Sequence, residues 1–389
     1  MANADSRAKA AGQPAVDVLV VGGGVMGLWT ALFAGRRGLS VCLVERARIG
    51  AGASGGLLGA LMPHLPDHWN AKKAFQFDAL VSLEREIAVL EAETGLSAGY
   101  RRCGRLMPLP RPHHRDIALG HARDAEAVWG PFSFEVLDAA PVAGWPAAAA
   151  MENGLVRDRL SARLSPRGLA AALAAGLARL PNVSVREGTA LVRFDPAAGV
   201  AHFADGGRLA FGDCVLAAGV ASFDLVSALG PPPKRPVGMA VKGQAALLRA
   251  DIDPALPVLF SDGLYIVPHD GGFAAVGSTS ENRFDDPFAT DAQLDDLIAR
   301  ARAMAPLLGD APVAERWAGL RPKAIGRDPM VGRHPDHARI HLMTGGFKVS
   351  FGLAHALARA VVNGLEGGTP ADVPPSFRVE AHLLEADRG

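Results

Sequence analysis

The pattern of hydrophobic and polar positions near the N-terminus predicts a strand, a helix and a second strand. Residues 16–21 read VDVLVV, a short Val-rich run that is typical of a strand buried on both faces of a parallel sheet. Helical spacing follows from Val25 to about Arg37, and Gly38 supplies a stop. Because residues 41–44 form another apolar run, the segment predicts a βαβ unit of about 30 residues.

Helical and strand-like patterns continue along the chain and change character in its middle. Ser165 and Pro166 have the cap and first-turn chemistry of a helix start. Short alternating runs separated by turns between 237 and 278 predict an antiparallel sheet. The other expected elements are helices at 71–94, 165–180, 291–304 and 350–365, and strands at 183–185, 190–194, 215–219 and 340–343.

These elements predict an α/β fold with a Rossmann-like parallel sheet. The α/β pattern resumes after the alternating strands of 237–278, so the parallel domain is discontinuous and the antiparallel sheet is inserted into it. Residues 100–155 are rich in Pro, His, Arg and Trp and give no ordered pattern.

A glycine-rich turn joins the first predicted strand to the first helix. The run from Gly22 to Gly27 has the spacing G-x-G-x-x-G. Gly22 permits a tight turn, Gly24 lets the backbone approach a pyrophosphate at the helix N-terminus, and Gly27 lets helix and strand pack closely. Glu45 follows the first glycine by 23 residues (45 − 22) and is expected to bind the adenosine ribose. An acid here disfavours NADP, which leaves FAD and NAD.

The segment after Glu45, residues 49–58 (IGAGASGGLL), consists mostly of small residues. It resembles the flavin-contacting loop of the D-amino-acid oxidase superfamily, which includes glycine oxidase and monomeric sarcosine oxidase, and in which small residues let backbone N–H groups approach the flavin. Together with this loop, similar blocks cover about 16 to 365, nearly the whole chain. They are GLYIVP at 263–268, VGST at 276–279, WAGLRP at 317–322, DPMVG at 328–332 and GGFKVS at 345–350.

The resemblance implies a Rossmann-like FAD-binding domain with an inserted antiparallel-sheet substrate domain. The expected segments are 16–98, 156–232 and 315–380 for the first domain and 99–155 and 233–314 for the second. No cysteine lies in the C-terminal third, where relatives of sarcosine oxidase attach their flavin, so non-covalent FAD is expected. The expected FAD contacts are Gly22, Gly24, Val25, Met26, Gly27, Glu45, Arg46, Ala53, Ser54, Gly55, Gly56, Leu57, Val192, Ala218, Gly219, Gly319, Arg321, Gly345, Gly346, Phe347, Lys348 and Val349.

Three side chains are candidates for the substrate site. The resemblance implies that Arg321 forms a bidentate pair with a substrate carboxylate, a task that suits the planar guanidinium. Tyr265 is expected to bind the same carboxylate or to form a wall of the pocket, although a core tyrosine fits equally well. Lys348 lies just before a predicted helix N-terminus, where a positive charge is unfavourable, which indicates an anion nearby: the substrate carboxylate or the reduced flavin.

Composition narrows the functional class. Lys plus Arg and Asp plus Glu number 40 each, so no net positive charge favours nucleic acid or an acidic membrane. No stretch reaches the ~18 apolar residues of a membrane span. The chain has three cysteines, Cys42, Cys103 and Cys214, and their odd number and wide spacing suggest neither a disulfide framework nor a CxxC metal site. A reducing cytoplasm is therefore expected. The segment from Met1 to Ala15 lacks a secretory apolar core and is expected to be a disordered tail.

The histidines indicate no metal site. His64 and His68 are four residues apart, but Pro66 between them breaks the helix that would align them. We therefore expect no metal, and a homo-oligomer is left open.

The sequence supports FAD-dependent oxidation of the C–N bond of a small amino acid or N-alkyl amino acid. In this hypothesis the carboxylate docks on Arg321, a hydride equivalent passes to flavin N5 and the imine hydrolyses in water. The alternatives are a 2-hydroxy-acid dehydrogenase, a flavin domain that modifies tRNA, and a flavoprotein subunit of a larger complex. The hydroxy acid ranks lower because the sequence shows no clear base for an alcohol.

Overall fold

The first of two large sheets contains the predicted βαβ unit. The computed structural model describes residues 15–365 and 373–388, so residues 1–14 of the expected tail lie outside it. The parallel strands of the sheet follow the order β18–β11–β1–β2–β8, and β17 adds an antiparallel edge. The strands are β1 (Val16–Val21), β2 (Val41–Val44), β8 (Val183–Arg186), β9 (Leu191–Asp195), β10 (Val200–Phe203), β11 (Arg208–Leu216), β17 (Met330–Arg333) and β18 (Ile340–Thr344).

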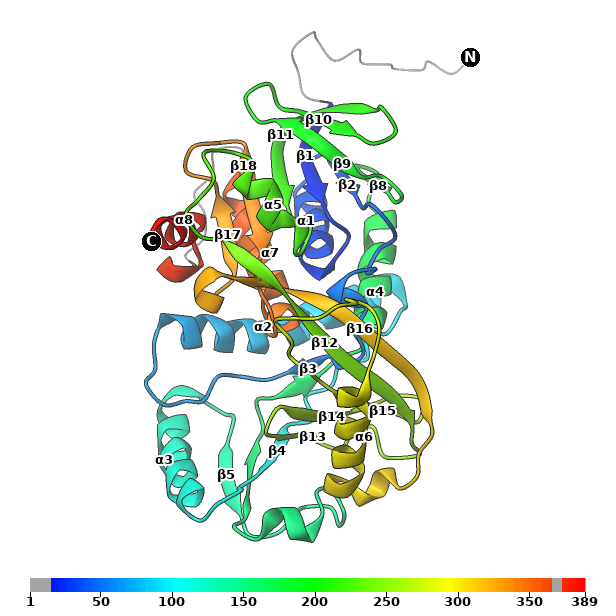
Figure 1. The fold of residues 1–389 in the computed structure, drawn as a ribbon, viewed down its shortest axis with the longest axis vertical. Helices are drawn as coiled ribbons and strands as arrows, with labels where there is room; N and C mark the ends of the chain where they lie inside the picture. Colours follow the sequence, from blue (N-terminus) through cyan, green and yellow to red (C-terminus); the bar gives the residue numbers. More distant parts are fainter. Residues whose placement is uncertain (1–14, 366–372, 389) are drawn as a thin grey trace.

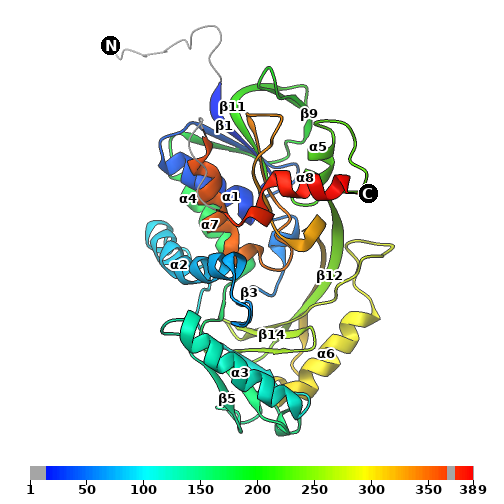
Figure 2. The same ribbon diagram turned by 90° about the vertical axis from the view of Figure 1, so that its left-hand side faces the viewer.

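Both faces of this sheet are covered by other elements, which explains why hydrophobic and polar residues do not alternate along β1. Val18 and Val20 belong to the core beneath α1, whereas Leu19 and Val21 belong to a second core on the opposite face. In Figure 2 the helices α1, α2, α4 and α7 lie on one side of the sheet, whereas α5 and α8 contribute to the core on the other. The helices are α1 (Val25–Arg36), α2 (Ala71–Thr94), α4 (Pro166–Ala178), α5 (Ala221–Ser227), α7 (Ser350–Asn363) and α8 (Val379–Asp387).

The second sheet is the inserted, mostly antiparallel one, and it occupies the lower half of the molecule in Figure 1. Its order is β16–β12–β15–β14–β13–β4–β6–β5, with β13 and β4 parallel. Its strands are β4 (Arg105–Pro108), β5 (Phe134–Leu137), β6 (Leu155–Asp158), β12 (Gly238–Arg249), β13 (Val258–Ser261), β14 (Leu264–His269), β15 (Phe273–Gly277) and β16 (Val313–Ala324).

The two faces of the second sheet have different partners. Residues such as Ala246 and Ile266 pack against α6 (Ala292–Met304). Residues such as Ala245 and Val267 point to the opposite face, where Leu57 of the expected flavin loop packs against them. A short pair of strands, β3 (Ala60–Leu61) and β7 (Ala162–Arg163), also forms beside this loop.

The structure adds two points to the organisation expected from the sequence. Residues 100–155, which gave no ordered pattern, contain β4, α3 (His113–Val128) and β5. The helix went unseen because only Ala118 and Ala125 of its 16 residues are buried, which leaves little apolar periodicity. Residues from 315 were assigned to the first domain, but β16 pairs with β12 along its length and so belongs to the second sheet.

Short turns of 3-10 helix connect several of these elements in the described residues. They lie at Ala53–Gly55, Ala148–Met151, Pro306–Leu308, Ile325–Arg327 and Pro375–Phe377. Within residues 15–365 and 373–388, every helix is too short or too polar to cross a membrane.

Candidate active site

A cavity of about 700 Å³ extends between the two sheets. At one end it is lined by the turn after β1, including Gly22 and Gly24, and by Glu45 after β2. At the other end it is lined by Tyr265 on β14 and Arg321 on β16. A cavity of this size and position is typical of a small-molecule or cofactor site.

The turn between β1 and α1 depends on two glycines. Gly22 has φ 115°, and a Cβ there would lie 2.4 Å from the carbonyl oxygen of Ala217 on the neighbouring segment. A Cβ on Gly27 would lie 2.0 Å from the carbonyl oxygen of Gly22. The glycines therefore allow α1 to start directly over the end of β1, with its N-terminus facing the cavity.

Glu45 has a fixed orientation at the edge of the cavity. One carboxylate oxygen accepts the Gly23 N–H at 2.8 Å, and the other accepts the Ala47 N–H at 2.9 Å. Nearby, the Ser54 hydroxyl oxygen accepts the Val25 N–H at 2.9 Å in the first turn of α1. The polar groups expected at the nucleotide end are thus brought together from three segments.

Most of the expected site residues line the cavity. They are Gly22, Gly24, Val25, Met26, Glu45, Arg46, Ala53, Ser54, Gly56, Leu57, Ala218, Gly219, Tyr265, Arg321, Phe347, Lys348 and Val349.

Five expected glycines shape the walls without lining the cavity: Gly27, Gly55, Gly319, Gly345 and Gly346. A Cβ on Gly319 would lie 2.4 Å from the Trp317 ring, which does line the cavity. A Cβ on Gly346 would lie 2.5 Å from the Met26 side chain.

Val192 lies apart from the other expected contacts. It is 62% exposed on β9 and does not line the cavity, whereas Thr189, Ala190 and Leu191 just before it do. Val192 therefore lies one residue beyond the last of these lining residues, and its contact with FAD stays a prediction.

Arg321 is a buried cation that faces the cavity. It is 9% exposed, and within the described residues its guanidinium forms one hydrogen bond, from Nη1 to the Thr279 carbonyl oxygen at 3.1 Å. In the part of the chain that the structure describes, no carboxylate forms an ion pair with it. Burial lowers the pKa of Arg321 to about 10, so it remains charged at neutral pH. A buried guanidinium without an anion is expected to take one from a ligand.

The absence of a side chain at Gly243 leaves room for the Arg321 guanidinium. No sequence motif had pointed to this glycine. On β12, Gly243 pairs with Gly319 and Val241 with Arg321, so Gly243 is the diagonal neighbour of Arg321 on one face. A Cβ on Gly243 would lie 2.0 Å from an Arg321 nitrogen. The guanidinium therefore lies flat over a position that has no side chain.

The variant Gly243→Ala is expected to displace Arg321 while leaving the nucleotide end intact. Because the clash involves the far end of a flexible side chain, we expect about a tenfold weaker affinity for carboxylate ligands, with unchanged FAD affinity. Titration of the visible spectrum of the FAD-loaded protein with benzoate measures this. An unaltered benzoate affinity would contradict the assigned contact.

Tyr265 is placed to donate a hydrogen bond into the cavity. Burial raises the pKa of its hydroxyl, although the charges of Arg105 and Arg321 oppose the shift. The hydroxyl is therefore protonated at neutral pH. Its ring packs against Phe260 at a centroid distance of 4.8 Å, which holds its orientation.

Lys348 lines the same end of the cavity. Its side chain forms no hydrogen bond or ion pair with residues 15–365 or 373–388, and its ammonium lies 5.6 Å from the centroid of the Phe347 ring. Burial and the charge of Arg321 lower the pKa of Lys348. Its proton is thus lost at lower pH than that of an ordinary lysine.

This lowered pKa predicts a pH dependence of anion binding. The charged ammonium attracts a carboxylate, so benzoate affinity should fall as the pH rises towards the pKa of Lys348. In Lys348→Met we expect a weaker but flat affinity between about pH 7 and about pH 9, where Arg321 is still charged. A parallel fall in both proteins would assign the titration to another group.

Sequence reasoning missed several lining residues at the substrate end. Leu61, Met62, Gln76 and Leu80 approach from β3 and α2. Gln76 is 4% exposed, and its side-chain oxygen accepts the His64 N–H at 2.6 Å. None of the lining residues comes from 100–155, although 99–155 were assigned to the expected substrate domain. No family motif marked α2, so no sequence signal pointed to these residues.

The residues present fit a dinucleotide cofactor. The glycine turn leaves the N-terminus of α1 open to a pyrophosphate, Glu45 is held where the ribose of such a cofactor would be expected, and the cavity continues to Arg321. No thiol or imidazole of the described chain lines the cavity.

Comparison with known proteins assigns the family. A family model described as FAD dependent oxidoreductase (DAO) matches residues 17–363. The chain belongs to this DAO family. FAD is therefore its cofactor, and the protein is an FAD-dependent oxidoreductase of amino acids or related amines.

Individual relatives of this DAO protein cover nearly its full length. Glycine oxidase from Pseudomonas putida is 30% identical over 378 residues, which span 94% of this chain and 99% of that protein. Glycine oxidase from Pseudomonas aeruginosa is 31% identical over 379 residues, with the same coverage.

Solved structures share the fold. Glycine oxidase from Geobacillus kaustophilus matches with a TM-score of 0.83 at 23% identity, covering 94% of this chain and 98% of that one. An iminodiacetate oxidase from Chelativorans sp. matches with a TM-score of 0.79 at 20% identity, covering 92% and 97%. The Rossmann-like FAD-binding domain with an inserted antiparallel sheet is thereby confirmed.

Proposed function

We propose that this DAO protein oxidises the C–N bond of a small amino acid or N-alkyl amino acid whose carboxylate binds Arg321. The observation that carries the proposal is a buried guanidinium at the cavity whose partner, among residues 15–365 and 373–388, is a carbonyl and not a carboxylate. The names of its relatives, glycine oxidase and iminodiacetate oxidase, support a substrate with a carboxylate next to a C–N bond.

The side chains at this end of the cavity divide the task of orienting the substrate. Arg321 supplies two parallel N–H donors for the carboxylate, and the Tyr265 hydroxyl donates a further hydrogen bond. Lys348 adds positive charge beside Arg321, which strengthens the attraction of an anion. Leu61, Met62 and Leu80 provide an apolar wall for the rest of a small substrate.

When bound, FAD would supply the redox chemistry, which is the removal of a hydride equivalent from the carbon next to the amine nitrogen. The protein contributes position and electrostatics. Ser350 and the residues before it place the N-terminus of α7 at the cavity, where a helix start stabilises negative charge. Arg321 and Lys348 add to this positive potential.

The test is an anaerobic visible spectrum of the FAD-loaded protein before and after each of four compounds. Glycine, sarcosine and iminodiacetate carry a C–N bond, and glycolate is the matched hydroxy acid without one. Bleaching of the flavin bands by an amine and not by glycolate is the expected result. Bleaching by glycolate alone would favour a 2-hydroxy-acid dehydrogenase, and no bleaching by any of them would contradict the proposal.

A further inference from the structure

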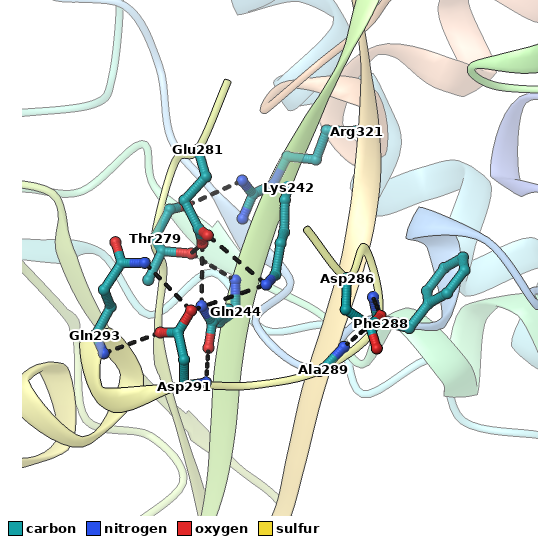
Figure 3. A network of polar contacts seen from close by, with 10 residues as sticks. All are labelled: Lys242, Gln244, Thr279, Glu281, Asp286, Phe288, Ala289, Asp291, Gln293 and Arg321. Atoms are coloured by element: carbon teal, nitrogen blue, oxygen red, sulfur yellow. Dashed lines mark hydrogen bonds and ion pairs between the residues drawn. The ribbon is translucent and has the colours of Figure 1, made fainter. Parts of the chain in front are cut away.

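A buried polar network lies beside Arg321 on the edge of the second sheet (Figure 3). Lys242 and Gln244 project from β12, and Thr279 and Glu281 lie on the segment that follows β15. Lys242 is 3% exposed, Gln244 0% and Thr279 8%. Groups this deeply buried are costly unless each finds a partner, so their contacts are informative.

The segment after β15 continues along β12 with a modified pattern of hydrogen bonds. Glu281 and Lys242 exchange both backbone hydrogen bonds, at 2.9 and 3.0 Å, as in an antiparallel bridge. At Gln244 the pattern changes, because its backbone N–H donates to the Thr279 hydroxyl oxygen at 2.9 Å. The hydroxyl thus takes the place of a backbone carbonyl as acceptor.

This exchange leaves the Thr279 carbonyl oxygen free for Arg321. The Arg321 guanidinium crosses over Gly243 and donates to that carbonyl at 3.1 Å. Since this is the one hydrogen bond of the guanidinium in the part of the chain that the structure describes, the direction of the Thr279 carbonyl decides where the remaining N–H groups point. The Thr279 hydroxyl therefore matters for Arg321 although it does not touch it.

Glu281 fixes the direction of the Thr279 hydroxyl. The hydroxyl donates to one Glu281 carboxylate oxygen, so its lone pairs face the Gln244 N–H. The carboxylate itself is held by the Gln244 side-chain amide at 3.1 Å and by the Lys242 ammonium at 3.7 Å. The negative charge of Glu281 also favours the charged form of Arg321.

We propose that Glu281 is a positioning residue for Arg321, acting through the hydroxyl and carbonyl of Thr279. The chain of contacts runs from Lys242 and Gln244 to Glu281, then to Thr279, and ends on the guanidinium. The inference rests on the proposed function, because it assigns Glu281 a purpose only if Arg321 binds the carboxylate of the substrate.

The test compares Glu281→Ala with Glu281→Gln in the FAD-loaded protein. Loss of the acceptor in Glu281→Ala should raise the benzoate Kd, and the KM of an amine found to bleach the flavin, by about tenfold. The kcat at saturation and the FAD affinity should stay within about twofold, because the reacting groups are untouched. In Glu281→Gln the amide oxygen still accepts from Thr279, so benzoate affinity should remain near that of the wild type.

Thr279 provides a second pair of variants should Glu281→Ala fail to fold. Thr279→Val removes the hydroxyl and keeps the carbonyl, so it should behave like the expected Glu281→Ala. Thr279→Ser keeps the hydroxyl and should behave like the wild type. Glu315→Ala is the matched control, because Glu315 lies on the same strand as Arg321 but pairs with Arg167 near the surface at 2.6 Å.

The outcomes distinguish a failure of the positioning role of Glu281 from a failure of the proposed function. Weak benzoate binding in Glu281→Ala and Thr279→Val, with recovery in Glu281→Gln and Thr279→Ser, supports the positioning role. Benzoate affinity that is unchanged in Thr279→Val, or equally weak in Glu281→Gln and Glu281→Ala, overturns it. If Arg321→Met itself binds benzoate normally, the carboxylate site at Arg321 fails, and the positioning role fails with it.

Discussion

Replacing Arg321 with methionine is expected to raise the KM for a carboxylate-bearing amine by about 100-fold, with a smaller effect on kcat. The physical reason is the loss of a charge-assisted pair of hydrogen bonds in a buried site, worth about 3 kcal/mol. Methionine keeps the apolar stem of the side chain and removes only the guanidinium, which lies over Gly243. Steady-state kinetics and the benzoate Kd measure the effect independently.

Arg316 offers a matched control on the same strand. It pairs with Asp295 near the surface and does not line the cavity, so Arg316→Met should leave KM unchanged. Retention of wild-type KM in Arg321→Met would remove Arg321 from the substrate site and the proposed function with it.

Substitution of Gly27 by alanine is expected to abolish FAD binding at micromolar concentrations and to destabilise the fold. The new Cβ would lie 2.0 Å from the Gly22 carbonyl oxygen, a backbone atom that no side-chain rotation can move away. Helix α1 or strand β1 must therefore shift, at a cost of about 1–3 kcal/mol in unfolding free energy. The shift also moves the N-terminus of α1 away from the pyrophosphate position.

Titration of the apoprotein with FAD and thermal unfolding measure the two effects. Gly120→Ala is the control, since a Cβ there meets its nearest atom, of Arg123, at 3.9 Å within α3. Alanine in this helix should stabilise the protein by about 0.5–1 kcal/mol and leave FAD affinity unchanged. Normal FAD affinity in Gly27→Ala would contradict the close approach of helix and strand.

The nucleotide end could be predicted from sequence because its signals are local. The mostly apolar sequence of β1 reflects burial on both faces of the sheet. The structure places α1 on one face and a second core on the other. The spacing between Gly22 and Glu45 corresponds to one helix and one strand, whose lengths are set by backbone geometry. Helix α2 occupies the predicted residues, Ala71–Thr94, because its Asn70 cap and Gly95 stop lie next to it in sequence.

The substrate end was predicted only in part, from resemblance. The cavity is lined at one end by Arg321, Tyr265 and Lys348, which lie far apart in the sequence. Met62 and Gln76 were missed because no sequence motif marks their segments, and the sequence does not indicate that these side chains line the cavity. Residues 100–155 gave no signal because α3 buries so few of its side chains.

The sequence by itself determined the βαβ unit, the glycine turn with Glu45, and the order of the main helices and strands. Each of these depends on neighbours within about 30 residues, where periodicity and capping chemistry are visible. Only the tertiary structure decided that the Arg321 guanidinium lies over Gly243 and that Glu281 acts on Thr279 beside it. These contacts follow from the register of β12 with β16 and with the segment after β15. Register is a property of paired strands and is not written in either strand alone.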